Sequence, residues 1–194
     1  MDYFRETGND GLEKEAEHRG YNNRVFSLYE LSLSANNYSA KAPTEYRRLI
    51  KEKHSRIYNC PSENIPIADL QEVFGLNADA KEIWRPVPWY SNAECYEASN
   101  FGRIRHFKQI MLQDEYEEFS GYLFLKDYVN ETDKKYRFNS STPIYRFVAA
   151  AFFPEYESPL HIHHIDNNGY DCRPDNLILL SKTEHSKVHG YFIP

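Results

Sequence analysis

The sequence that decides the fold runs from Leu160 to Gly190 and reads LHIHHIDNNGYDCRPDNLILLSKTEHSKVHG. Five of the eight histidines of the chain lie in this stretch. Histidine is the commonest metal ligand and the usual general base near neutral pH. Such a cluster therefore indicates a metal-binding or catalytic site.

The spacing within this stretch predicts a strand, a loop, a second strand and a helix. Residues 161–165 and the apolar run 177–180 fit two strands, and the Asp, Asn, Gly and Pro residues between them favour turns. Ser181 followed by Glu184 resembles a capping box that opens a helix. Gly190 is placed where such a helix would stop.

The histidines fall at positions where they could act together. His185 and His189 are four residues apart, so both rings lie on one face of the predicted helix. His163 and His164 are neighbours on the predicted strand, so they point to opposite sides of it. One of this pair could share a metal ion with the helix while the other acts on a water molecule. His161 is expected to face away from the centre or into solvent.

This arrangement resembles the ββα-metal core, or His-Me finger, of HNH nucleases over roughly residues 158–191. The family motif is a His pair, a central Asn and a His on the helix. The resemblance implies that His164 is the general base and that Asn176 orients it by hydrogen bonding across the loop. The implied ligands of one divalent metal ion are His163, His185 and His189.

The resemblance leaves the identity of the ion open between Mg²⁺, Mn²⁺, Zn²⁺ and Ni²⁺. A His at position 163, where many phage members have Asp, makes the ligand set softer and favours Zn²⁺, Ni²⁺ or Mn²⁺. The alternative is a structural zinc site on a binding module. Closed sites of that kind usually have four protein ligands, often Cys, and Cys172 could join only from inside the predicted loop.

The segment 82–105 resembles the NUMOD4 module, which accompanies HNH cores in phage and mobile-element endonucleases. It contains Trp84, a Tyr-x-x-Ser-Asn stretch at 96–100 and a Gly-Arg-x-Arg that ends at Arg105. Arg103 and Arg105, two apart on a strand, share one face and could bind DNA phosphates. The alternative is a β-hairpin that carries these arginines on its solvated side.

Elsewhere the pattern predicts helices early in the chain and short strands after them. One helix begins after Pro43 and a second ends at Gly75, and a third runs from Pro143 to Phe153. The predicted strands are 96–99, 103–107, 122–129 and 136–138, the last two joined by a turn at 130–133.

The helix after Pro43 carries a basic face. Its cations are Arg47, Arg48, Lys51, Lys53 and Arg56. Ordinary helix patterning favours a solvated surface helix, and a phosphate-contacting helix is the alternative. His54, on the same helix, has no partner recognisable from the sequence and is expected to be solvated.

The composition fits a globular protein of 194 residues with enough chain to bury a core. Its net charge of -6 counts against a nucleic-acid partner, as does the acidic run at 114–118, although local basic patches can still bind phosphates. Three widely separated cysteines argue against a disulfide framework and fit a reducing cytoplasm. No apolar run reaches the length of a membrane span, and the N-terminus lacks a signal-peptide pattern.

We therefore expect an α+β protein with a helical N-terminal region (1–80), a small β-rich NUMOD4-like module (81–140) and an HNH core (141–194). The expected function is divalent-metal-dependent hydrolysis of DNA by a homing-type or phage-associated endonuclease. A non-catalytic DNA-binding protein with a structural metal site, and a restriction or defence nuclease with the same chemistry, are the alternatives. The sequence does not give the target site or the oligomeric state.

Overall fold

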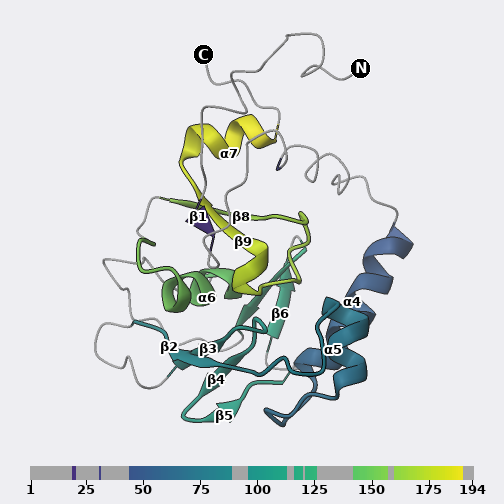
Figure 1. Cartoon of the computed structure of the whole chain (residues 1–194). Helices are drawn as coiled ribbons and strands as arrows, with labels where there is room; N and C mark the ends of the chain where they lie inside the picture. Colours follow the sequence, from purple (N-terminus) through teal and green to yellow (C-terminus); the bar gives the residue numbers. More distant parts are fainter. Residues whose placement is uncertain are drawn as a thin grey trace.

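The C-terminal strands and helix form one end of the molecule (Figure 1). The computed structural model describes residues 19–20, 31, 44–88, 96–112, 116–119, 121–125, 142–156 and 160–189. β8 (His161–His164) pairs antiparallel with β9 (Leu177–Leu180), and β1 (Arg19–Gly20) pairs with the other edge of β9.

The loop between β8 and β9 ends in a short 3₁₀ turn, η2 (Pro174–Asn176). α7 (Lys182–Val188) follows β9 directly. The predicted capping box is present, because Ser181 Oγ accepts from Glu184 N and the Glu184 carboxylate accepts from Ser181 N. The predicted strand, loop, strand and helix are confirmed.

A four-stranded antiparallel sheet lies on the side of the molecule away from α7 (Figure 1). Its strands are, in order, β2 (Trp84–Pro86), β3 (Tyr96–Ser99), β4 (Ile104–His106) and β5 (Gln109–Ile110). The turn between β3 and β4 needs Gly102, which has φ +80°. A Cβ there would lie 2.9 Å from the Cys172 carbonyl carbon, so this turn packs directly against the β8–β9 loop.

A separate hairpin is made by β6 (Tyr116–Phe119) and β7 (Tyr122–Leu125). The sequence predicts a strand from 122 and pairs it with 136–138. The structure pairs β7 with β6, and the predicted partner strand at 136–138 lies outside the described residues.

Helix α6 (Ile144–Phe152) lies between the β8–β9 strands and the β2–β5 sheet (Figure 1). It confirms the helix predicted over 143–153. Its buried side chains belong to one hydrophobic core that includes residues of both the predicted β-rich module and the predicted nuclease core. That core includes Val87, Ala98, Ile104, Ile144, Phe147, Phe152, Leu177 and Leu179.

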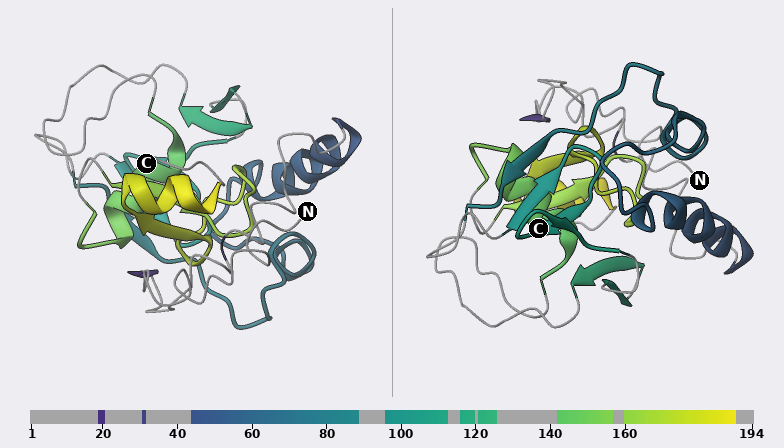
Figure 2. Two further views of the ribbon diagram at one scale, coloured as in Figure 1. Left: turned by 90° about the horizontal axis from the view of Figure 1, so that it is seen from above. Right: turned by 90° about the horizontal axis from the view of Figure 1, so that it is seen from below.

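Helices α4 (Thr44–Tyr58) and α5 (Ile67–Phe74) pack together beside the sheets (Figure 2). Gly75 ends α5 in the left-handed region, as the sequence predicts. On the exposed face of α4, Arg48 pairs with Glu45 and Glu52. The basic face is therefore partly neutralised by carboxylates of its own helix, which favours the surface-helix interpretation. None of the helices in the described ranges has the length and apolarity to cross a membrane.

Candidate metal centre

Three histidines converge between β8 and α7. One ring nitrogen each of His163, His185 and His189 lies within 4.8 Å of the others. His163 projects from β8 toward α7, with its ring centroid 5.6 Å from that of His185 and 5.0 Å from that of His189. The two helix rings are 4.6 Å apart, as expected for positions one turn apart. The structure thus brings together the three residues that the sequence predicts as metal ligands.

The electrostatics of this cluster fit a divalent metal ion. Burial, followed by the neighbouring His189 and His161, lowers the pKa of His185 to about 4. Burial also lowers the pKa of His189. Metals bind the neutral imidazole, and three protein nitrogens leave a fourth tetrahedral position for water or substrate.

His161 lies beside this cluster, contrary to the sequence-based expectation. Its ring centroid is 5.1 Å from that of His185. The reason is the period of two along a strand, which puts His161 on the same face as His163. His161 is not part of the group of three whose nitrogens all lie within 4.8 Å of one another.

His164 occupies the opposite face of β8, as the sequence predicts. Its ring lies 5.0 Å from Tyr145 of α6, edge to face, and 5.7 Å from Tyr122 of β7. The residue is 5% exposed, and Nε2 has no hydrogen-bond partner among the described residues. Burial lowers the pKa of His164 to about 4, against the opposing effect of Asp171. The ring is therefore neutral at physiological pH, which is the form that a general base needs.

Asn176 acts on the loop and not on the His164 ring. Its Nδ2 donates to Asp166 Oδ1 (2.7 Å) and to Asp171 O (2.9 Å), and its Oδ1 accepts from Asp166 N (3.1 Å). The predicted hydrogen bonding across the loop is present. Asn176 bonds to the backbone and carboxylate that follow His164, however, and not to the His164 ring. Burial, then Asp171, raises the pKa of Asp166 to about 6.

The tyrosines around His164 are functional candidates that sequence reasoning missed. Tyr122 lies outside the stretch 158–191, and nothing local to it signals a contact with that stretch. Gly169 is another residue that sequence reasoning missed. A Cβ at this residue would meet Gly121 O at 2.3 Å and the Tyr122 ring at 2.7 Å. The β6–β7 turn is therefore packed onto the loop that follows the base.

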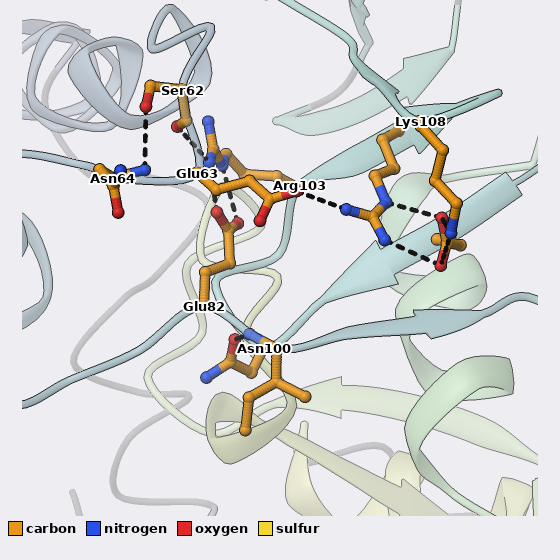
Figure 3. Close-up of polar contacts among 10 residues, drawn as sticks. Ser62, Glu63, Asn64, Glu82, Asn100, Arg103 and Lys108 are labelled. Atoms are coloured by element: carbon orange, nitrogen blue, oxygen red, sulfur yellow. Dashed lines mark hydrogen bonds and ion pairs between the residues drawn. The ribbon is translucent and has the colours of Figure 1, made fainter.

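The prediction that Arg103 binds DNA phosphates is wrong. Its side chain is 0% exposed and forms a buried ion pair with Glu82. It also donates to Ser62 O at 2.9 Å, which ties the β3–β4 turn to the segment after α4 (Figure 3). A guanidinium in this position cannot reach a duplex.

Arg105 shares a face with Arg103, as predicted, because both guanidinium groups lie over the Trp84 ring. Its charge is engaged by Glu97 at 2.6 Å and by Glu63 at 2.5 Å, and its side chain is 11% exposed. The shared face is covered by protein. The alternation of side chains along a strand predicts that the two arginines share a face, but it does not show whether that face is exposed to solvent.

The expectation that His54 is solvated is also wrong. The residue is 6% exposed and its ring packs edge to face on Phe74, with centroids 5.5 Å apart. Its Nε2 lies 3.3 Å from Asn168 Nδ2, in the β8–β9 loop. The helical pattern of α4 alone does not show that this polar position faces another part of the chain.

Comparison with known families agrees with this geometry. Residues 145–187 match the family model described as HNH endonuclease, and residues 82–141 match the NUMOD4 motif. The first match contains His163, His164, Asn176 and His185. No curated protein and no solved structure matches the chain. The chain thus contains a segment that matches the NUMOD4 motif, followed by a segment that matches HNH endonucleases.

Proposed function

We propose that the chain is a divalent-metal-dependent endonuclease that hydrolyses phosphodiester bonds in DNA. The observation that carries the proposal is that two neighbouring histidines of β8 face opposite sides of the strand and have different surroundings. His163 faces two further histidines of α7, and the adjacent His164 faces the other way in a neutral, buried setting. A group of histidines that can hold a metal ion, next to an unprotonated imidazole, is what metal-assisted hydrolysis of a phosphodiester needs.

In this proposal His163, His185 and His189 hold the ion. A bound divalent ion supplies Lewis acidity, which polarises the scissile phosphate and stabilises the departing oxygen. His164 takes a proton from the attacking water, and Asn176 holds the turn from Ile165 to Asp171 that fixes the end of β8. The expected products carry 5′-phosphate and 3′-hydroxyl ends.

The second candidate is a DNA-binding protein whose metal site is only structural. A closed tetrahedral site would need a fourth protein ligand, and among the described residues His161 is the candidate, with its ring 5.1 Å from that of His185. The three-nitrogen group without His161 favours the open, catalytic form of the site.

The biological role that we propose is that of a homing-type or phage-associated enzyme. It rests on the presence of a NUMOD4 motif before the HNH segment. A restriction or defence nuclease would use the same chemistry. The two roles differ in the target, because a homing-type enzyme is expected to require a long asymmetric site and a restriction enzyme a short palindrome.

The test is cleavage of a supercoiled plasmid library that carries randomised inserts, by metal-stripped protein reloaded with Mg²⁺, Mn²⁺, Ni²⁺ or Zn²⁺. Nicking or linearisation should require a metal and should be lost in His164→Ala and in His185→Ala. Asp79→Ala, an exposed position in the segment after α5, is the control and should cut normally. Sequencing of the cut inserts gives the target and separates the two biological roles.

Two outcomes would contradict the proposal. Wild-type protein that binds the library and a metal ion but cuts no insert with any metal would favour the structural-site candidate. Cutting that survives in His164→Ala would mean that another residue is the base.

A further inference from the structure

Helix α4 contacts the β8–β9 loop through two buried side chains. His54 and Tyr58 are four residues apart, so they lie on one face of α4. Tyr58 Oη donates to Tyr170 O at 3.1 Å and lies 3.5 Å from Gly102 O. α4 lies outside both matched segments, 82–141 and 145–187, yet it is attached to each of them.

The hydrogen bonds of Asn168 indicate which ring nitrogen of His54 carries the proton. Asn168 Oδ1 accepts from Tyr170 N at 3.1 Å, so its Nδ2 is the atom that faces His54 Nε2 at 3.3 Å. An amide nitrogen only donates, so Nε2 is the acceptor and the proton of the neutral ring is on Nδ1. Burial lowers the pKa of His54 to about 4, in agreement with a neutral ring.

Asn168 connects this contact to the turn that begins at His164. Asn168 N donates to Asp166 Oδ1 at 2.8 Å, and the same oxygen accepts from Asn176 Nδ2 at 2.7 Å. Asn167 N donates to His164 O at 2.8 Å. The turn after the proposed base is thus held from inside the loop by Asn176 and from α4 by His54.

We propose that His54 is a positioning residue of the nuclease site, which acts through Asn168 on the turn that sets the position of His164. The inference rests on the proposed function and assigns a role to helix α4. A displacement of a reacting group by 1 Å can cost about a hundredfold in rate. A hydrogen bond to the turn beside the base can therefore control the rate without touching DNA or metal.

The competing explanation is that His54 only fills space. Its ring packs near Phe74 and Tyr170, and a phenylalanine, although somewhat larger, would keep a ring at this position. The pair His54→Phe and His54→Gln separates the two explanations. Phe keeps a ring but has no acceptor, whereas the side-chain oxygen of Gln can take the place of Nε2 as acceptor for Asn168.

The first measurement is single-turnover cleavage by the full chain, with DNA affinity, Zn²⁺ affinity and melting temperature measured on the same preparations. His54→Phe should slow cleavage by about tenfold or more while both affinities stay unchanged, and His54→Gln should regain most of the rate. Ser55→Ala is the matched control, because the Ser55 hydroxyl bonds within its own helix, to Glu52 O. A Phe variant that cuts as fast as wild type, or a Gln variant as slow as the Phe variant, overturns the proposal.

The second measurement does not depend on cleavage. Amide hydrogen exchange at Asp166, Asn168 and Tyr170 should be faster in His54→Phe than in wild type and close to wild type in His54→Gln. If wild-type protein cuts no DNA, the proposed function fails, but these exchange rates still decide whether His54 holds the turn. Equal exchange in wild type and in His54→Phe overturns the positioning role.

Discussion

The ring of Tyr122 on β7 lies 5.7 Å from the ring of His164 on β8. The two residues belong to different matched segments, because Tyr122 falls within the NUMOD4 match and His164 within the HNH endonuclease match. The ring of Tyr145 of α6 lies 5.0 Å from the same imidazole. The setting of the proposed base is therefore assembled from both segments.

Replacement of Tyr122 should separate the role of its ring from that of its hydroxyl. Tyr122→Ala removes one wall of the His164 site, and we expect single-turnover cleavage to fall by about tenfold or more, because the imidazole loses its fixed orientation. Tyr122→Phe keeps the ring and should cut at nearly the wild-type rate. A Phe variant as slow as the Ala variant would show that the hydroxyl takes part.

The substitution Gly169→Ala tests the contact between the β6–β7 turn and the loop. The added Cβ would meet Gly121 O at 2.3 Å, and a backbone oxygen cannot move aside as a flexible side chain can. Overpacking of this kind typically costs about 1–3 kcal/mol. Urea denaturation measures the loss, and an unchanged midpoint would mean that the turn does not rest on Gly169.

Replacement of Arg103 should affect stability and not the electrostatics of DNA binding. Arg103→Ala leaves the buried Glu82 without its partner, and breaking a buried ion pair costs about 3–5 kcal/mol. The double variant with Glu82→Gln should recover part of this loss. For the folded fraction, the dependence of DNA affinity on salt should match wild type, whereas a shallower salt dependence would restore Arg103 as a phosphate contact.

The variant His161→Ala distinguishes an open metal site from a closed one. Because the three clustered nitrogens do not include His161, its removal should leave the affinity for Zn²⁺ close to that of wild type. His185→Ala should lose most of that affinity. Isothermal titration calorimetry compares the two, and equal losses would identify His161 as a fourth ligand of a structural site.

The stability of the protein should depend on pH through His54. Burial lowers its pKa from 6.5 to about 4 in the folded chain, against Asp171, which raises it, and together with Arg173 and Lys53, which lower it further. Between these two pH values the unfolded chain binds more protons, so the contribution of His54 is complete above pH 6.5 and is lost as the pH falls toward 4.

In His54→Gln the melting temperature should therefore fall less steeply than in wild type over this range. A residual fall is expected in both proteins, because burial also lowers the pKa of His164. Differential scanning fluorimetry measures both curves, and parallel curves would contradict a buried, neutral His54.

Several elements could be predicted because their signals are local. The Ser181–Glu184 capping box, the apolar run of β9 and the spacing of His185 and His189 each depend on neighbours within a few residues, and the structure contains all three. The opposite directions of His163 and His164 follow from strand geometry alone.

The errors on His54 and Arg103 share one physical cause. Helix and strand periods give the face on which a side chain lies, but what covers that face depends on contacts distant in the chain. His54 is buried by a loop more than a hundred residues away, and Arg103 by Glu82 and the segment after α4. His161 was misplaced for a different reason, since the period of two already puts it beside His163.

The sequence by itself determined the order of the C-terminal elements and the residue types of the proposed metal centre, because turn, cap and period signals act over a few residues. Only the tertiary structure decided that Tyr122 lies against His164, that His54 bonds to Asn168 and that Arg103 forms a buried ion pair with Glu82. These contacts join segments far apart in the sequence, and they form only when the hydrophobic core around α6 brings those segments together.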